Sequence, residues 1–504
     1  MSLSIDWKKL QKGSDIRGVA LEGIEGEFVN LSNSVVEQLG KAFAHWLKQN
    51  KKRSSDLKVA VGMDSRLTGV ALKTAFSQGL NSMGVDVYDC GIASTPAMFM
   101  ATIDEIYSID GGVMLTASHL PFNRNGLKFF TSEGGAEKSD ISEILELASQ
   151  NLTSFGDQGK LSELDYLSVY SNSLVNAIRS GVKEGVDRNQ PLKGLKIIVD
   201  AGNGAGGFFA DKVLKVLGAD VTGSQFLDPD GNFPNHVPNP EDEEAMNSIC
   251  EAVKREKADL GIIFDTDVDR SAIVDREGNA INRNELIALI SAVVLEEHPG
   301  TTVVTDSITS DGLGWFINKH LGGKHKRFKR GYKNVINESI RLNEEGQESW
   351  LAIETSGHAA LKENYFLDDG AFLVAKLLIK MADLRLKNQE LPQLISELQR
   401  PVESREYRLH IKTDDFSTYG QRVISELENS LDDDWIKVAE NYEGIRVQCK
   451  SDHEDGWFLV RLSLHDPVIP VNIESNVPGG VDQIVTRLKE FFQKYEELDL
   501  TALV

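Results

Sequence analysis

Apolar runs and amphipathic stretches alternate along much of the chain, and they predict strands and helices in turn. The repeating unit consists of an apolar strand, a Gly- or Ser-containing turn, an amphipathic helix and a second strand. One copy begins at Leu57 and another at Leu195, where the second strand is expected over 219–226 (ADVTGSQF); a weaker third copy begins at Thr301. Strands and helices alternating at this spacing predict parallel sheets with right-handed crossovers, the layered α/β class.

The pattern changes after about Pro401. Strand-like stretches such as YRLHIK and WFLVRLSL alternate apolar and polar positions around helical segments, which predicts a smaller α+β domain. At 504 residues the chain is too long for a single hydrophobic core, so several domains are expected. Ligand-binding loops should follow the carboxyl ends of the strands.

Charge and composition limit the classes of partner and the cell compartments that are expected for this protein. A formal net charge of −23 argues against nucleic acid, which is bound by basic surfaces, so an anionic substrate would need a local cluster of Lys and Arg. The three cysteines have no disulfide or zinc spacing, which favours the cytoplasm. The N-terminus lacks an apolar leader and the most apolar stretch, 286–295, is too short to span a bilayer, so neither export nor membrane insertion is expected.

A serine follows the apolar run in GGVMLTASHLPFNRNGLKFF. Ser118 and His119 stand where a loop should begin, and a serine there becomes a nucleophile if basic groups activate it; His119 and Lys128 are the candidates. Taken alone, the segment favours a simpler interpretation, a turn-forming serine beside a solvent-facing histidine. The GxSxG nucleophile elbow is absent, which argues against a serine hydrolase of that type.

Three aspartates follow the apolar stretch ADLGIIF. Asp265, Asp267 and Asp269 alternate in DTDVDRS, and such carboxylates at a strand end predict a site for a hard cation, best Mg²⁺. A calcium EF-hand is excluded, because Arg270 and Arg276 stand where that loop needs Gly and Glu. An aspartyl-phosphate phosphatase with Asp265 as nucleophile remains a minor alternative.

A glycine motif suggests a competing function. Gly202, Gly204 and Gly207 form GxGxxG between a strand and a helix, the context of a dinucleotide-binding oxidoreductase. Only Asp228 stands near the place of the acidic residue that such a site needs. A tight turn packing helix on strand explains the same glycines.

Taken together, three segments resemble the signature loops of the α-D-phosphohexomutase family, namely TASHLPFNRNGLKFF, FDTDVDRS and IETSGH. The likeness continues in SDIRG, GMDSR, VDAGNGAGG, DGNFPNHVPNP, the DDG that follows the third loop, and GWFLVRLSLHDPVIP. The resemblance implies four domains around a central cleft, three consecutive α/β mixed-sheet layered domains and a smaller C-terminal α+β domain. The corresponding ranges are 1–160, 161–280, 281–400 and 401–504.

The resemblance also implies a reaction, the interconversion of hexose 1-phosphate and hexose 6-phosphate, with glucose or mannose as the sugar. Ser118 would be a phosphoserine, and a hexose 1,6-bisphosphate would be intermediate and activator. General acid and base work would fall to His119 and Lys128. The small-molecule hexose phosphates are then the partners, with neither nucleic acid nor membrane involved; the sequence leaves the oligomeric state open.

The remaining roles carry over residue by residue. The phosphoryl group on Ser118 and the three aspartates Asp265, Asp267 and Asp269 would hold Mg²⁺, while Arg270 neutralises developing charge. Sugar and phosphate contacts would come from Arg17, Lys329, Glu354, Ser356, His358, Arg461 and Ser463. On their own, Glu354, Ser356 and His358 are equally typical of a loop with helix-cap residues around Gly357.

The phosphate loop departs from the family pattern Arg-Pro-Ser-Gly-Thr-Glu-Pro. Here Leu464 replaces the glycine and His465 the threonine, which restricts the backbone and removes a hydroxyl. A second class of function therefore stays open: a sugar-phosphate-binding regulatory relative with weak or no mutase activity. The intact serine, aspartate and sugar loops favour an active mutase.

Overall fold

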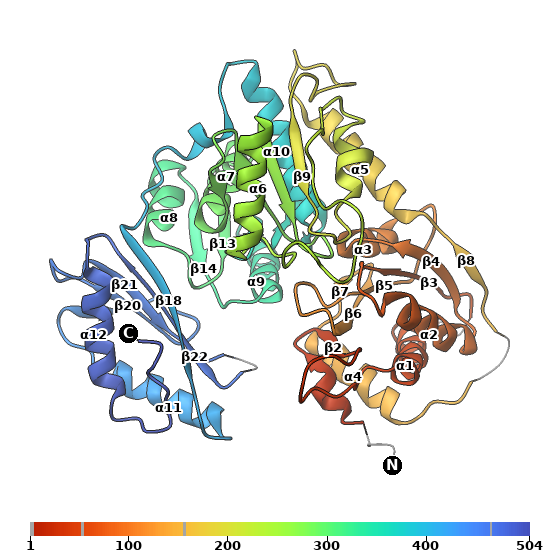
Figure 1. Cartoon of the computed structure of the whole chain (residues 1–504), viewed down its shortest axis with the longest axis horizontal. Coiled ribbons are helices and arrows are strands. Elements are labelled where there is room, and N and C mark those ends of the chain that lie inside the picture. Colours follow the sequence, from red (N-terminus) through yellow and green to blue (C-terminus); the bar gives the residue numbers. More distant parts are fainter. Residues whose placement is uncertain (1–4, 52–54, 155–157, 464–465, 504) are drawn as a thin grey trace. The chain divides into compact units, whose positions relative to one another are not determined.

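The protein is described by a computed structural model that covers residues 5–51, 55–154, 158–463 and 466–503. The chain divides into two compact units (Figure 1). Unit 1 comprises Met1–Leu286 and Ser356–Gln393, and unit 2 comprises Ile287–Thr355 and Leu394–Val504. The chain therefore leaves the first unit and returns to it once before ending in the second.

The first sheet of unit 1 has a parallel centre and an antiparallel edge. Its order is β1-β2-β6-β5-β3-β4-β8, with β7 paired to β6. The parallel strands are β5 (Gly111–Leu115), β3 (Lys58–Met63), β4 (Asp86–Ile92) and β8 (Leu161–Glu163). The antiparallel strands are β1 (Gln11–Lys12), β2 (Asp15–Val19), β6 (Arg124–Thr131) and β7 (Gly134–Gly135).

Helices cover both faces of this sheet. A Cβ on Gly111 would meet Phe43 of α1, whereas one on the next residue, Gly112, would meet Met98 of α3. Because successive strand residues point to opposite faces, α1 and α3 lie on opposite sides. On the α1 side Phe43, Phe76 and Phe129 pack together in the core. The helices here are η1 (Trp7–Leu10), α1 (Asn33–Lys51), α2 (Gly69–Ser82), α3 (Thr95–Ile103), α4 (Lys138–Ser149) and α5 (Tyr166–Gly181).

The second sheet of unit 1 has the order β12-β11-β10-β9. Strands β9 (Ile197–Asp200) and β10 (Leu260–Phe264) are parallel, and β11 (Ser271–Asp275) and β12 (Ala280–Ile281) continue antiparallel. The helix α6 (Glu243–Glu256) packs against β10, and the short π-helix η2 (Phe209–Leu214) packs against β9. This mixture of parallel and antiparallel strands agrees with the expected α/β fold class.

The strand predicted over 219–226 does not form. Only two isolated bridges remain, Lys196 with Asp220 and Asp200 with Gln225. The intervening residues turn, because Ser224 N donates to Val221 O at 3.1 Å, and Gly223 adopts a positive φ of 98° that breaks an extended ladder.

The returning segment of unit 1 begins with an antiparallel pair, β16 (Ala359–Leu361) and β17 (Leu367–Asp368), joined through η4 (Lys362–Asn364). The long helix α10 (Gly370–Arg385) follows and packs against α5 and β11. Asp369 caps this helix by accepting from Phe372 N at 2.8 Å, and it also accepts from the hydroxyl of Tyr170 on α5 at 2.6 Å. The segment is thereby fastened to the rest of unit 1.

Unit 2 contains a parallel set of strands and a separate antiparallel sheet. The parallel set runs β14 (Lys324–Arg327), β13 (Thr302–Thr305), β15 (Ser349–Ile353), with α8 (Asp311–Trp315), η3 (Phe316–His320) and α9 (Tyr332–Glu344). Two further helices, α7 (Arg283–Glu297) and η5 (Leu391–Ile395), carry the chain across the divisions between the units.

The antiparallel sheet of unit 2 is the predicted C-terminal α+β region. Its order is β18-β22-β21-β20-β19, and its core joins Val423 and Leu488 of the helices to Phe458 and Val471 of the strands. The strands are β18 (Glu403–His410), β19 (Trp435–Lys437), β20 (Ile445–Cys449), β21 (Gly456–Val460) and β22 (Val468–Ser475), and the helices are α11 (Phe416–Glu428) and α12 (Gly480–Phe492).

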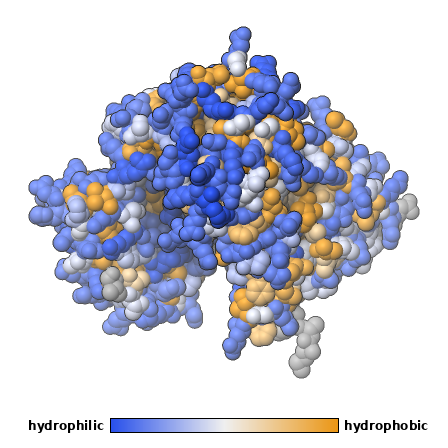
Figure 2. All heavy atoms as spheres, turned by 45° about the horizontal axis from the view of Figure 1, so that its top comes forward, coloured by the Kyte–Doolittle hydropathy of each residue, from blue (hydrophilic) through white to orange (hydrophobic). Residues whose placement is uncertain are grey.

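The surface agrees with the polar composition, in which 26% of the residues are charged. The face drawn in Figure 2 is mostly hydrophilic, with hydrophobic residues scattered over it. Within the described ranges, every helix is too short or too polar to span a bilayer.

Candidate active site

Ser118 lies in unit 1, just beyond the carboxyl end of β5. It is buried, with 3% of its surface exposed, and its φ is +50°. Its hydroxyl Oγ donates to Asp265 Oδ2 at 3.0 Å and accepts from Arg270 Nη2 at 2.9 Å. A carboxylate that can attract its proton and a guanidinium that can stabilise negative charge thus contact the same oxygen. Ser118 does lie in a turn, but these contacts give it more than the turn-forming role of the simpler interpretation.

The three predicted aspartates converge at the end of β10. Asp265, Asp267 and Asp269 are buried, and one carboxylate oxygen of each lies within 4.8 Å of the others. Within the part of the chain that the structure describes, Oδ1 of Asp267 and Oδ1 of Asp269 accept no hydrogen bond. Buried carboxylate oxygens without donors are costly, so this cluster fits a metal ion with oxygen ligands.

Two buried cations face these carboxylates. Lys128 Nζ, from β6, donates to Asp267 Oδ2 at 3.0 Å and also to Asp269 Oδ2. Arg270 Nη2 donates to Asp265 Oδ2 at 2.9 Å. With all five groups ionised one negative charge is left over, which a bound cation would offset.

The pKa values of the aspartates reflect this balance. Burial and the neighbouring Asp269 raise the pKa of Asp265 well above its ordinary value. Burial also acts to raise the pKa of Asp269, but the positive charges of Lys128 and Arg270 outweigh it and the net shift is downward. The cluster thus holds carboxylates with different proton affinities side by side.

His119 faces the site and not the solvent. Its Nδ1 lies 3.3 Å from Ser118 Oγ and 2.7 Å from Arg270 Nη2, which can only donate, so Nδ1 carries no proton. Burial, with the positive charges of Arg270 and Arg17, lowers the pKa of His119 to about 3. The imidazole is therefore neutral at physiological pH.

Three further predicted residues belong to unit 1. Arg17, on β2, pairs with Asp15 at 2.9 Å. His358 Nε2 lies 3.7 Å from Asp269 Oδ1, and its Nδ1 lies 2.8 Å from Ser356 Oγ. Burial, followed by the charges of Arg270 and Lys128, lowers the pKa of His358 well below its ordinary value. The structure thus brings His358 and Ser356 to the aspartate cluster.

The residue Asp368 was not predicted from the sequence. Its Oδ2 lies 3.6 Å from His358 Nε2, and Asp269, His358 and Asp368 form a second group whose atoms could hold a metal. The DDG that follows the sugar loop was the available signal. Asp269 belongs to both groups, so the two cannot be filled independently.

Unit 2 holds Lys329, Glu354, Arg461 and Ser463. Lys329 is exposed, whereas Glu354 is buried and its Oε1 accepts from Gly331 N at 2.6 Å. Burial lowers the pKa of the Arg461 guanidinium, which lies in the field of Glu443. Ser463 N donates to Val468 O at 3.0 Å. The differing positions Leu464 and His465 lie outside the described residues.

The GxGxxG glycines have a packing role. A Cβ on Gly204 would lie 2.7 Å from Thr266 O, and one on Gly207 would lie 2.1 Å from Leu227 O. Ala205 N donates to Thr266 O at 2.8 Å. Side chains would not fit here. Close contact with the loop that carries the aspartates explains Gly204, and close contact with Leu227 explains Gly207.

Thr95 and Thr266, which the sequence did not single out, join the site to its surroundings. Thr95 opens α3; its N donates to Asp267 O at 2.8 Å and its hydroxyl to Asp267 Oδ2. Thr266 donates to Ser118 O at 2.9 Å. Both are ordinary threonines in the local pattern, and only the fold shows what they contact.

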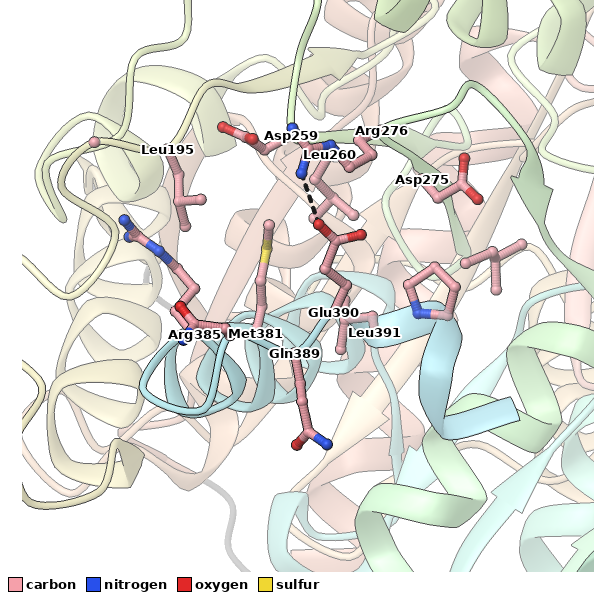
Figure 3. A pocket seen from close by; sticks show the side chains of 14 residues that line it. Leu195, Asp259, Leu260, Asp275, Arg276, Met381, Arg385, Gln389, Glu390 and Leu391 are labelled. Atoms are coloured by element: carbon pink, nitrogen blue, oxygen red, sulfur yellow. Dashed lines mark hydrogen bonds and ion pairs between the residues drawn. The ribbon is translucent and has the colours of Figure 1, made fainter. Parts of the chain in front are cut away.

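A separate cavity of about 420 Å³ lies elsewhere in unit 1 (Figure 3). Its lining includes Leu195, Leu260 and Met381, with Arg276 and Glu390 ion-paired at 2.6 Å. Leu260 opens β10 whereas Asp265 follows its last residue, which at about 3.3 Å per residue separates the two by about 16 Å. The cavity is therefore distinct from the aspartate site and contains none of the predicted site residues.

The fold and the site define a class: layered α/β proteins with a buried serine hydroxyl, an acidic metal-type cluster and an arginine at strand ends, a set suited to phosphoryl transfer. Three models of phosphoglucomutase/phosphomannomutase domains match the chain, α/β/α domain I over residues 8–154, domain II over 170–278 and domain III over 282–401. The chain belongs to the phosphoglucomutase/phosphomannomutase family, as the sequence motifs predicted.

Individual relatives agree over nearly the whole length. A phosphoglucomutase of Neisseria gonorrhoeae is 29% identical over 97% of each chain. A phosphomannomutase/phosphoglucomutase of Pseudomonas syringae pv. tomato is 31% identical over 93% of this chain and 92% of its own. The crystal structure of a family protein from Burkholderia thailandensis superposes with a TM-score of 0.78 at 26% identity, covering 97% of this chain and 98% of that one.

Proposed function

We propose that this protein is a phosphohexomutase that interconverts hexose 1-phosphate and hexose 6-phosphate, with glucose and mannose as the sugars. The observation that carries the proposal is the Ser118 hydroxyl, buried between Asp265 and Arg270 beside the acidic cluster. Relatives named for both sugars support it. No finding favours the alternative of a regulatory sugar-phosphate binder without activity.

The reaction runs through a phosphorylated Ser118. In the first half, the free hydroxyl of a hexose 1-phosphate attacks that phosphorus and the bond to Ser118 Oγ breaks, which gives a 1,6-bisphosphate. In the second half, Ser118 Oγ attacks the phosphoryl group at carbon 1, so that the 6-phosphate leaves and the phosphoserine is restored. Arg270 stabilises the charge on Oγ whenever it is the leaving or attacking atom.

Asp265, Asp267 and Asp269 would hold Mg²⁺ together with the phosphoryl group on Ser118. Their buried oxygens suit the ion, which prefers oxygen ligands and shares its sites with phosphates. When bound, the ion neutralises charge on the phosphoryl oxygens.

Lys128 and His119 have different parts in proton transfer. Lys128 donates to both Asp267 and Asp269, so its ammonium can exchange a proton within the acidic cluster that contacts Ser118. His119 is neutral, and with a pKa of about 3 it binds a proton weakly. We therefore assign Lys128 to general acid and base work, and His119 to orienting Arg270, whose Nη2 donates to its Nδ1.

The substrate contacts are assigned by resemblance to the sugar and phosphate loops of the family. Ser356, His358 and Glu354 offer groups that donate and accept hydrogen bonds, as paired sugar hydroxyls require. Arg461 and Ser463 would hold the substrate's phosphate that does not react, and Arg17 and Lys329 would add positive charge for substrate binding. These assignments rest on the matching family motifs. We also propose a cytoplasmic location, because Cys90, Cys250 and Cys449 are all free thiols.

The proposal is tested by mutase turnover. Purified protein is incubated with Mg²⁺, glucose 1-phosphate or mannose 1-phosphate and a trace of the corresponding 1,6-bisphosphate, and phosphorus NMR follows the products. We expect the 6-phosphate from wild type and none from Ser118→Ala. Tight binding of the sugar phosphates without any turnover would instead favour the regulatory alternative.

A further inference from the structure

The side chain of Arg66 lies beneath the loop that carries Ser118. It is buried, and its guanidinium donates to four carbonyl oxygens between Ser118 and Arg124, the first residue of β6. Nη1 donates to Pro121 O at 2.8 Å and Arg124 O at 2.9 Å; Nη2 donates to Ser118 O and Leu120 O, each at 2.5 Å. One side chain therefore binds the chain at Ser118 and again where β6 begins.

The guanidinium is itself held in place. Arg66 Nε lies 3.4 Å from Asp64 Oδ2, and Arg66 N donates to Asp64 Oδ1 at 2.9 Å. The ring of Phe233 lies 5.4 Å from the guanidinium carbon. Asp64 N donates in turn to Leu115 O at 3.0 Å, at the end of β5. A planar fork with five donors can make this set of bonds, and a lysine ammonium cannot.

Ser118 needs such support because of its backbone. Its φ of +50° is sparsely populated by residues with a side chain and persists only where the surroundings impose it. Its carbonyl accepts a second bond, from Thr266 Oγ1 at 2.9 Å, and its N donates to Thr116 Oγ1 at 2.9 Å. Relaxation of φ would swing the Cα–Cβ bond and carry Oγ away from Asp265 and Arg270.

We propose that Arg66 and Thr266 are positioning residues for phosphoryl transfer. They hold the Ser118 peptide so that Oγ stays within hydrogen-bonding distance of Asp265 and Arg270. The inference rests on the proposed role of Ser118. Neither side chain hydrogen-bonds Ser118 Oγ within the described residues; each acts through the Ser118 carbonyl. Thr266 also stands between Asp265 and Asp267, so this carbonyl links the serine loop to the metal loop.

The first test is Arg66→Lys, which keeps the charge and loses the fork. We expect kcat to fall about 100-fold, the scale of a 1 Å misplacement, with KM within about threefold of wild type. The rate at which glucose 1,6-bisphosphate phosphorylates Ser118, followed by intact mass, should fall in parallel. Binding of glucose 1-phosphate, measured by calorimetry, should be retained, which a general structural defect would not allow.

The second test is Thr266→Val with Thr102→Val as its matched control. Thr102 is also a buried threonine whose hydroxyl donates to a carbonyl, that of Phe99 at 2.7 Å, but within α3. We expect kcat to fall about tenfold in Thr266→Val and to stay within about twofold of wild type in Thr102→Val. If Arg66→Lys fails to fold by circular dichroism, this pair decides the question.

The outcomes separate the two proposals. An inactive wild type, or an active Ser118→Ala, overturns the proposed function. With wild type active and Ser118→Ala inactive, wild-type kcat in Thr266→Val and in any folded Arg66→Lys overturns the positioning role. An equal loss of kcat in Thr266→Val and Thr102→Val overturns it as well, since any buried hydroxyl would then have the same effect.

Discussion

The chemistry of Ser118 is set by the side chains and carbonyls around it. Its hydroxyl gains reactivity from Asp265 and Arg270, and its backbone is fixed by Arg66 and Thr266. The place of the three aspartates after an apolar strand predicted their role, whereas the roles of Ser118 and Arg270 were predicted from the resemblance of their loops to the family's signature segments. Sequence patterns did not identify Arg66, Thr95 or Thr266, whose partners lie 52, 172 and 148 residues away in the chain.

Removing the Arg270 guanidinium should cost both activity and stability. Arg270→Met leaves the buried carboxylate of Asp265 without its ion pair, so we expect the free energy of unfolding to fall by about 3 kcal/mol and kcat by about 10³-fold. Arg276→Met is the control, since the Arg276 pair with Glu390 is half exposed and contributes about 0–1 kcal/mol. Equal losses in urea denaturation of the two variants would contradict this account of the buried pair.

The two acidic groups can be told apart by metal binding. We expect Mg²⁺ to raise the melting temperature of wild type and to have no such effect on Asp267→Asn, which removes a carboxylate from the proposed site. Asp368→Asn alters only the group of Asp269, His358 and Asp368, and should keep the Mg²⁺ effect. The opposite result, with Asp368→Asn insensitive and Asp267→Asn responsive, would place the ion in the second group.

At the scale of the elements, local patterns predicted strands well where apolar runs are short and bounded. The strands β3, β5 and β10 stand where LKVAVG, GGVML and LGIIF predict them. The prediction of a strand over 219–226 was wrong, because the turn at Val221–Ser224 interrupts a segment whose composition is typical of a strand. The division into units 1 and 2 was not predictable either, since it depends on a segment, Ser356–Gln393, that returns to the first unit.

A buried carboxyl on β22 should make stability depend on pH. Glu474 accepts from Trp457 Nε1 on β21 at 2.8 Å, and burial raises its pKa from 4.5 to about 7. Because the pKa is higher in the folded protein than in the unfolded chain, the protonated carboxyl stabilises the fold. This contribution is complete below pH 4.5 and is lost as pH rises through about 7. We expect Glu474→Gln to remove this loss. The difference in the free energy of unfolding between Glu474→Gln and wild type should therefore be about 3 kcal/mol more favourable to the variant at pH 8 than at pH 4.

The control for this prediction is Glu454→Gln. Glu454 accepts from Trp435 Nε1 at 2.9 Å in the same way, but Arg487 pairs with it at 2.9 Å. In urea denaturation at pH 8 we expect Glu454→Gln to be destabilised, because Arg487 loses its ion pair, whereas Glu474→Gln is not. An unchanged pH slope in Glu474→Gln would show that this carboxyl does not titrate with folding.

At the scale of the whole molecule, an acidic protein binds an anionic substrate through local positive charge. The net charge is −23, yet Arg17, Lys128 and Arg270 are all in unit 1 and act electrostatically on the site residues. The family and its fold class could be predicted from motifs spread along the chain. The domain ranges stay predictions, because the motifs do not mark the boundaries between domains. The effects of Leu464 and His465 also stay predictions, because these two residues lie outside the described part of the chain.

The local positive charge and the negative net charge predict different effects for two anionic ligands. A hexose 1,6-bisphosphate present at a hundredfold excess over its Kd should stabilise the folded protein by about 2.7 kcal/mol, which thermal denaturation detects as a higher melting temperature. A DNA duplex at the same concentration should produce no shift, because the net charge of −23 repels it. A comparable shift with DNA would contradict the proposed class of ligand.

The central claim, that Ser118 carries the transferred phosphoryl group, is tested most directly by trapping that group. The protein is treated with glucose 1,6-bisphosphate, the peptides are mapped by mass spectrometry, and the phosphorylated protein is then mixed with glucose 1-phosphate alone. We predict one phosphate on Ser118, and its transfer to the sugar to form the bisphosphate and then the 6-phosphate. Phosphate found on another residue, or phospho-Ser118 that does not transfer, would contradict the account.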